Sequence, residues 1–250
     1  NLLRKFSGRI KSDDGEESDE EADKDDPEIE DLEVKKGLNQ FVWNLRYRSV
    51  EVPKGARVWG FTGGQPAVPG GYQVKVQRGE WSSVQPLMVL SDPRIDTSQD
   101  EFEAQFEMAT NIKSNLSEIY DTVREIRSIR EQLKRIEDNA EKAEIKIGNE
   151  GLRQEIQEQL TVIEEELIQT RNESGQDPLN FPPMLDNQFA YLYGYVAGGN
   201  DRPTEGAAVR FEDLRREWEA VAERYRRLVE NQVKGYSEAV EDSGLPRIVY

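Results

Sequence analysis

Two kinds of hydrophobic periodicity divide this chain. Between Phe41 and Tyr47, and again between Tyr72 and Val76, apolar residues alternate with polar ones. A period of two is typical of a half-buried β-strand. From Phe102 onward, apolar residues recur every three or four positions, which is typical of an amphipathic helix. The pattern therefore predicts a β-rich first part and a helical second part.

The β-rich part is predicted to contain four or five short strands between Leu38 and Leu90. Turn-forming residues separate these strands: Pro53, Gly55, Gly63, Gly64, Pro66 and Pro69–Gly71. Closely spaced strands with such turns are typical of an antiparallel sandwich of immunoglobulin type, although roughly fifty residues supply only part of one. Residues 1–7 (NLLRKFS) read as a further strand, which we expect to pair with Phe41–Tyr47.

The helical part is predicted to contain four helices. Their ranges are about 98–142, 150–173, 185–197 and 204–242. Ser98 and Glu101 have the spacing of a capping box at the start of the first helix, and Thr204 suits the N-cap of the last. A short turn between the first two helices predicts that they pack antiparallel.

These patterns place the chain in the α+β class with two domains. Residues 1–95 are expected to form a partial immunoglobulin-like antiparallel β-sandwich with a disordered acidic insertion at about 11–35. Residues 96–250 are expected to form an antiparallel helical bundle of long helices, whose last residues (PRIVY) dock on the bundle or on another molecule. The heptad-like spacing of the helices also leaves a coiled-coil homo-oligomer open.

The acidic charge of the chain is concentrated in one segment. The formal net charge is −17, and Asp13–Glu33 contributes −13 of it through 14 acidic residues and Lys24. Nucleic-acid and anionic-membrane partners are disfavoured, because both require a clustered basic face. No apolar run approaches the roughly 18 residues of a membrane span.

The acidic segment has two interpretations. A segment this poor in apolar residues is typical of a solvated loop. Closely spaced carboxylates are also the ligands that Ca²⁺ prefers. The candidate Ca²⁺ ligands are Asp13, Asp14, Asp23, Asp25 and Asp26. Because their spacing does not match the helix–loop–helix calcium motif, the loop interpretation is favoured.

No catalytic constellation is visible in the sequence. The chain has no Cys and no His, which removes thiolate nucleophiles and histidine bases. The acidic residues lie on predicted solvated faces, and the glycine-rich stretches match no phosphate-binding loop. The sequons at Asn115 and Asn172 fall on charged helices and are interpreted as coincidental. We therefore assign no catalytic or cofactor-binding residue to this chain, and no metal ligand beyond the less favoured calcium candidates.

Five aromatic residues are the remaining candidates for an interaction site. These are Trp59, Trp81, Tyr191, Tyr193 and Tyr195. Aromatic side chains stack on sugars and also pack against neighbouring elements of the protein itself, and packing is the favoured interpretation.

Several stretches carry a family resemblance that spans residues 1–231. GLNQFVWNLRY, PAVPGGYQVKV, QPLMVLSDPRI and SQDEFEAQFEMATNI resemble the C-terminal region of large bacterial proteins with sortilin-type or sialidase-like (BNR-repeat) β-propellers, often labelled glycosyl hydrolases. NFPPMLDNQFAYLYGYVAGGNDRP is similar to the later helices of that region. The resemblance implies an upstream propeller in the same polypeptide and export to the periplasm or cell surface. Its motifs are structural, so no active-site residue carries over.

Together these observations lead to two functional hypotheses. The first is a non-catalytic structural and interaction module at the C-terminus of a secreted β-propeller protein, which packs against that propeller or against other proteins. The alternative is an accessory region of a glycan-processing enzyme whose active site lies in the propeller. The chain begins without Met, and we expect it to be a piece of a longer polypeptide.

Overall fold

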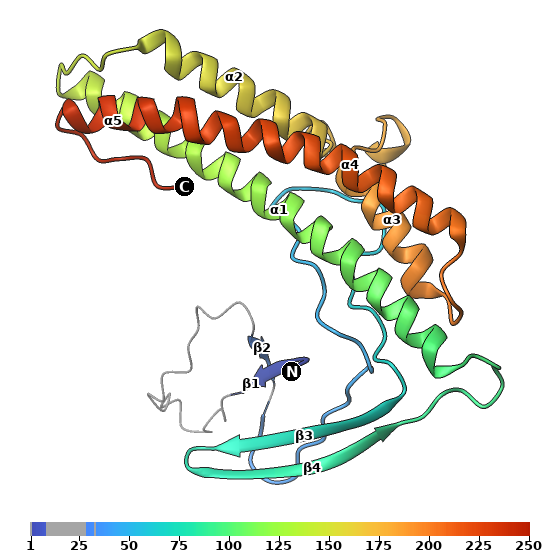
Figure 1. Ribbon diagram of the computed structural model, residues 1–250. Helices are drawn as coiled ribbons and strands as arrows, with labels where there is room; N and C mark the ends of the chain where they lie inside the picture. Colours follow the sequence, from blue (N-terminus) through green and yellow to red (C-terminus); the bar gives the residue numbers. More distant parts are fainter. Residues whose placement is uncertain (1, 9–28, 33) are drawn as a thin grey trace. The chain divides into compact units, whose positions relative to one another are not determined.

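The structure, a computed structural model, describes residues 2–8, 29–32 and 34–250 (Figure 1). It contains both helices and strands, so the prediction of an α+β chain is confirmed. The chain divides into two compact units, residues 1–49 with 63–91 and residues 50–62 with 92–250. Residues 50–62 thus belong to the second unit, although the residues on both sides of them belong to the first. We call residues 50–62 the strap.

Among its described residues, the first unit contains two small sheets. β1 (Lys5–Ser7) pairs in parallel with β2 (Ile29–Asp31). β3 (Gly70–Arg78) and β4 (Trp81–Val89) form an antiparallel hairpin joined by two residues. The first loop residue, Gly79, has a φ of 54°, and a two-residue hairpin loop favours glycine at such a left-handed position.

Two predictions for the first unit are wrong. The first is the pairing of NLLRKFS with Phe41–Tyr47, because the partner of β1 is β2. The second is the number of strands between Leu38 and Leu90, where the structure has β3, β4 and one isolated bridge between Arg46 and Pro66.

Residues 41–47 alternate in polarity without forming a regular strand. Leu45 has a φ of 56°, a left-handed conformation that interrupts an extended ladder. The segment still bonds to another part of the chain, since Tyr47 N–H donates to Gln65 O (3.0 Å) and Ala67 N–H donates to Leu45 O (2.8 Å). The alternation does not match burial either, since Phe41 and Leu45 are exposed and Arg46 is partly buried.

The second unit is built on α1 (Gln99–Lys142), which is about 66 Å long at 1.5 Å per residue. The predicted capping box is confirmed: Glu101 N–H donates to Ser98 Oγ (3.3 Å), and Ser98 N–H donates to the Glu101 carboxylate (2.9 Å). The apolar stripe of α1 faces the core along most of the helix. Its buried members include Ala109, Ile112, Leu116, Ile119, Val123, Ile126, Ile129, Leu133 and Ile136.

Four further helices pack around α1 and one another (Figure 1). They are α2 (Glu150–Leu167), α3 (Leu185–Gly198), α4 (Glu205–Arg227) and α5 (Lys234–Asp242). A short 3₁₀ turn, η1 (Asp177–Leu179), lies between α2 and α3. Thr204 caps α4, since its hydroxyl accepts the N–H of Ala207 (3.2 Å). α2 ends six residues before the predicted position because Ile168 is extended, with a φ of −133°.

A π-helical turn, η2 (Leu228–Val233), joins α4 to α5. The sequence predicts one continuous helix here, with Gln232 next in the apolar stripe after Leu228. The π turn adds one residue, so that the buried residue after Leu228 is Val233. After α5 the chain turns at Gly244 (φ 82°), and residues 246–250, here called the tail, return along the helices (Figure 1).

No helix within residues 2–8, 29–32 and 34–250 has both the length and the apolar composition needed to span a membrane.

Candidate functional site

The strap is held by hydrogen bonds within itself and to the rest of the second unit. Its two ends are joined where Val50 N–H donates to Thr62 O (2.7 Å). Between them, Ala56 N–H donates to Pro53 O (3.0 Å), and Gly55 has a φ of 79°. The predicted turn residues Pro53 and Gly55 therefore do form a turn, and this turn lies against the helices of the second unit.

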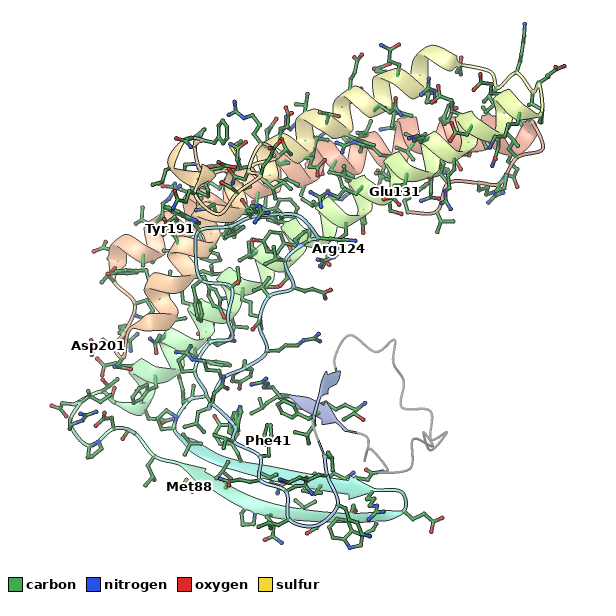
Figure 2. All side chains as sticks on the ribbon, turned by 180° about the vertical axis from the view of Figure 1, so that it is seen from behind. Phe41, Met88, Arg124, Glu131, Tyr191 and Asp201 are labelled. Atoms are coloured by element: carbon green, nitrogen blue, oxygen red, sulfur yellow. The ribbon has the colours of Figure 1, made fainter. Side chains whose placement is uncertain are left out.

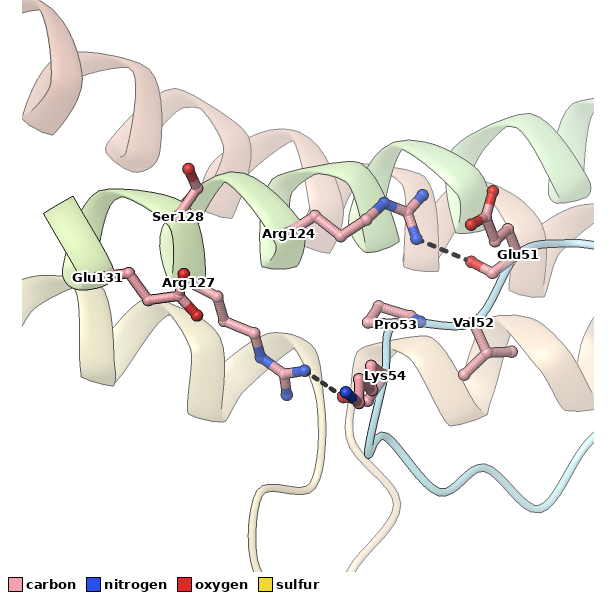
Figure 3. Close-up of a pocket in the computed structure, with 8 residues that line it drawn as sticks. All are labelled: Glu51, Val52, Pro53, Lys54, Arg124, Arg127, Ser128 and Glu131. Atoms are coloured by element: carbon pink, nitrogen blue, oxygen red, sulfur yellow. Dashed lines mark hydrogen bonds between the residues drawn. The ribbon is translucent and has the colours of Figure 1, made fainter. Parts of the chain in front are cut away.

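Side chains of the helical region bind the main chain of the strap. Arg124 Nη1 donates to Glu51 O (3.0 Å), and Arg127 Nη1 donates to Lys54 O (2.6 Å), as Figure 3 shows. Further along, Asn172 Nδ2 donates to Arg57 O (3.2 Å). These contacts involve only the main chain of the strap, so they hold it whatever its side chains are.

Asn187 on α3 pairs with both polar groups of one strap residue. Trp59 N–H donates to Asn187 Oδ1 (2.9 Å), and Asn187 Nδ2 donates to Trp59 O (2.9 Å). The carboxamide thus takes the place that a neighbouring strand has in a sheet. Two residues later, Phe61 N–H donates to Ala190 O (3.2 Å). The strap therefore runs along α3 in a fixed register.

Glycine allows this close approach of the strap to α3. A Cβ on Gly60 would lie 2.5 Å from the Cβ of Ala190, and a Cβ on Gly194 would lie 2.9 Å from the Cβ of Phe61. A Cβ on Gly198, one turn further along α3, would meet nothing within 4 Å.

We expect Gly194→Ala to lower the free energy of unfolding by about 1–2 kcal/mol, because its new methyl group overlaps the base of the Phe61 side chain. The same change at Gly198 is the matched control, and it should leave stability unchanged or raise it by up to about 1 kcal/mol through helix propensity. Urea unfolding followed by circular dichroism measures both. Equal effects at the two positions would contradict the close packing of the strap on α3.

A buried carboxyl lies next to this contact. Asp186, near the N-terminus of α3, is buried, and its Oδ2 lies 3.3 Å from the hydroxyl of Tyr120. Its other oxygen accepts the N–H of Asn187 (2.6 Å). Burial raises the pKa of Asp186 to about 7, and the hydrogen bonds from Asn187 and Tyr120 only partly oppose this. Burial also raises the pKa of Tyr120 well above its usual value.

Such a pKa is typical of a catalytic acid, but the geometry does not suit catalysis. A general acid must reach a substrate. Asp186 is sealed between α1 and α3, and it does not line the pocket described below. Its titration near neutral pH therefore bears on the stability of α3 and of the Asn187–Trp59 contact.

A second buried carboxyl joins α1 to α2. Glu164 on α2 accepts from Arg127 Nε (2.8 Å) and also pairs with Arg130. Arg127 contacts both the strap carbonyl at Lys54 and Glu164, so one guanidinium joins the strap, α1 and α2. The Nε atom of Arg130 is buried without a partner.

An open pocket of about 320 Å³ lies where the strap meets α1 (Figure 3). Its lining consists of Glu51, Val52, Pro53, Lys54, Arg124, Arg127, Ser128 and Glu131. The guanidinium groups are engaged, that of Arg124 with Asp121 (2.6 Å) and that of Arg127 with Glu164. Ser128 Oγ accepts a hydrogen bond from the carboxamide of Gln132 (3.2 Å). A carboxamide cannot act as a base for the serine hydroxyl. The two arginines of the pocket thus hold the strap.

The aromatic candidates from the sequence separate in the structure. Tyr193 is fully buried, and its ring centroid lies 5.1 Å from that of Phe61. Tyr191, which Figure 2 labels, and Tyr195 both lie on α3 with 56% and 61% of their surface exposed. Trp59 is 38% exposed, and its Nε1 donates to Gly175 O (2.7 Å). Trp81 is exposed at the start of β4, in the first unit.

The calcium candidates Asp13, Asp14, Asp23, Asp25 and Asp26 lie outside the described residues. Over the part of the chain that the structure describes, no group of acidic side chains is arranged to hold a metal ion. The sequon residue Asn172 is buried and bonded to Arg57 O, which agrees with a structural role.

The contacts made by Asn187, Asn172 and Asp186 were not predicted from the sequence. One signal was present for Asp186, which lies three residues before Phe189 and seven before Tyr193, on the apolar face of a predicted helix. A carboxyl in that position predicts a buried polar contact. No pattern marks an asparagine that binds a loop more than a hundred residues away.

Comparison of the chain with protein-family models, with curated protein sequences and with solved structures finds no match in any of the three.

Proposed function

We propose that this chain is a non-catalytic structural and interaction module of a secreted or cell-surface β-propeller protein. The observation that carries the proposal is the use of the polar side chains of the second unit. Arg124, Arg127, Asn172 and Asn187 all bind the main chain of the strap. The strap belongs to the second unit, and the residues before and after it belong to the first.

The finer fold assignments belong to the same proposal. In the β3–β4 hairpin, Val74, Val76 and Trp81 lie on one face and are exposed. A two-stranded hairpin with an apolar face is marginally stable alone, which supports a place for it in a larger immunoglobulin-like sandwich. The shared core of α1–α5 supports a helical bundle. The propeller, the bacterial origin and the export to the periplasm or cell surface rest on the sequence resemblance.

A direct assay tests the proposal. The purified chain should release no product from glycosidase or peptidase substrates, because Ser128, the hydroxyl that lines the pocket at the strap, bonds to Gln132 and not to a base. A commercial glycosidase and protease assayed in parallel establish sensitivity. Turnover that one Asp or Glu substitution abolishes would overturn the proposal.

The exposed aromatic residues favour one second candidate, an accessory region of a glycan-processing enzyme. Trp59, Tyr191 and Tyr195 expose large ring areas on the second unit, and Trp81 does so on the first. Tryptophan fluorescence titrated with polysaccharides decides this candidate, because stacking on a sugar changes the emission of a partly exposed indole. A response that does not change with polysaccharide concentration excludes this candidate.

Sedimentation equilibrium tests a coiled-coil homo-oligomer, which a strict monomer excludes.

A further inference from the structure

The tail is held on the second unit as a bound peptide is held. Ile248 is buried in the helical core, and its N–H donates to Ser237 Oγ on α5 (3.1 Å). The carboxamide of Gln132 on α1 binds both polar groups of the next residue: Val249 N–H donates to Gln132 Oε1 (2.8 Å), and Gln132 Nε2 donates to Val249 O (2.7 Å). Before this anchor, Arg247 pairs with Glu241 (2.6 Å).

These contacts define a simple recognition rule. One branched aliphatic side chain enters the core, and two side chains of the helices bind main-chain groups that every residue other than proline has. A basic residue one position earlier meets a carboxylate. Main-chain binding with one side-chain anchor is how extended peptides are recognised. We call Gln132, Ser237, Glu241 and the burial place of Ile248 the tail site.

The π turn η2 brings Ser237 into the tail site. Leu228 and Val233 are both buried and are five residues apart, after which Ser237 follows four residues later, also buried. Without the extra residue, the helix would rotate by about 100° at this point, and Ser237 would leave the tail side. π turns are rare and occur often at functional positions, which makes this one a second indication of a built site.

Most residues of the tail remain exposed to solvent. Val249 and Tyr250 are 75% and 52% exposed, so the anchor is Ile248 together with three hydrogen bonds. The segment joins α5 through Gly244 and Pro246, a short connection outside the helix. A tethered segment with a single anchor is open to competition from a free segment with the same features.

We propose that the tail site is a peptide-binding site that this chain occupies with its own tail, and that an extended segment of a partner protein with the pattern basic–aliphatic–any residue except proline displaces the tail. The inference deepens the proposed function and rests on it, since it names the kind of partner that an interaction module binds.

Fluorescence anisotropy with a labelled peptide, SGLPRIVY, tests the proposal on the full chain. Ile248→Asp, which expels the tail from the apolar anchor place, should bind the peptide about tenfold more tightly than the unaltered chain. The reason is that a tethered tail at an effective concentration of about 1 mM competes with a free peptide of about 100 µM affinity. Adding Gln132→Ala to that variant should weaken binding about tenfold, because two hydrogen bonds are lost.

Matched controls make the outcome decisive. Lys134→Ala in the Ile248→Asp background changes the exposed face of the same helix and should leave peptide binding unchanged. A peptide with Asp at the Ile position should not bind. If Ile248→Asp does not fold by circular dichroism, Ile248→Ala, which only removes part of the anchor, replaces it in the same comparison.

Equal affinity of the opened variant and the unaltered chain would overturn the proposal, as would binding that Gln132→Ala leaves unchanged. Either result leaves the assay for turnover unaffected, so failure of the peptide site is distinguishable from failure of the proposed function.

Discussion

Replacing Glu164 by Gln is expected to lower the free energy of unfolding by about 3 kcal/mol, because it leaves two guanidinium groups without their carboxylate. The expected loss lies at the low end for a broken buried pair, since the side chains of Arg127 and Arg130 are 32% and 29% exposed and are partly hydrated. Arg130 Nε already lacks a partner, so the site has no spare acceptor. Urea unfolding at pH 7 measures the change.

The neighbouring residue supplies the control. Glu165 has the same side chain on the same helix but is exposed, and Glu165→Gln should change stability by less than about 0.5 kcal/mol. Because Arg127 also binds Lys54 O, Glu164→Gln should in addition speed hydrogen exchange of the strap amide of Ala56, which bonds to Pro53 O. A stability loss below about 1 kcal/mol would show that the pair is hydrated in solution.

Replacing Asp186 by Asn is expected to make the protein more stable at and above neutral pH. In the folded state the pKa of Asp186 is about 7, against an ordinary value of 3.8, so the folded state holds the proton up to a higher pH than the unfolded state. The favourable contribution of the neutral carboxyl is complete below about pH 4 and is lost as the pH rises from about 4 through 7. Asparagine remains neutral throughout.

The difference in stability between Asp186→Asn and the unaltered chain should therefore grow between pH 4 and 7 and then level off. Its plateau should be at most about 4 kcal/mol, from 1.36 kcal/mol per pKa unit. Urea unfolding at pH 4, 5, 6, 7 and 8 measures it. Asp177→Asn is the control, because hydrogen bonds from Ser174 and Glu173 lower the pKa of Asp177 and its titration lies below this range. Parallel curves for Asp186→Asn and the unaltered chain would contradict a buried titrating carboxyl.

The two predictions concern one structural arrangement. Glu164 acts on the strap through Arg127, and Asp186 lies beside Asn187, which binds the strap at Trp59. Each buried carboxyl is thus linked to a main-chain contact of the strap through one intermediate residue, Arg127 for Glu164 and Asn187 for Asp186. A change at either carboxyl should therefore alter the hydrogen exchange of the strap amides.

Helix periodicity was the most informative signal in the sequence. The stripe from Ala109 to Ile136 is buried as expected, and the capping box at Ser98 starts α1 at the predicted place. A long helix buries one face along its whole length, so many residues repeat the same information and single exceptions do not change the prediction. The β-rich part has fewer repeats, and one left-handed residue, Leu45, was enough to break the predicted strand.

The candidate site was largely invisible in the sequence. Asn187 binds Trp59 across 128 positions, and Gln132 binds Val249 across 117. An asparagine or glutamine on a predicted helix is ordinary, and only the arrival of a distant main chain gives it a partner. The early end of α2 has the same origin, since the residues after it turn toward the strap, where Asn172 and Gly175 bind Arg57 and Trp59.

The sequence by itself determined the mixed helical and β character of the chain, the positions of the long helices, their caps and the core stripe of α1. Each of these depends on residues close together in the chain, through backbone hydrogen bonding and side-chain periodicity. Only the tertiary structure decided that the strap joins the helical unit, that Asp186 and Glu164 are buried, and that a π turn directs Ser237 to the tail. These depend on contacts between segments far apart in the chain, for which local propensity and period carry no information.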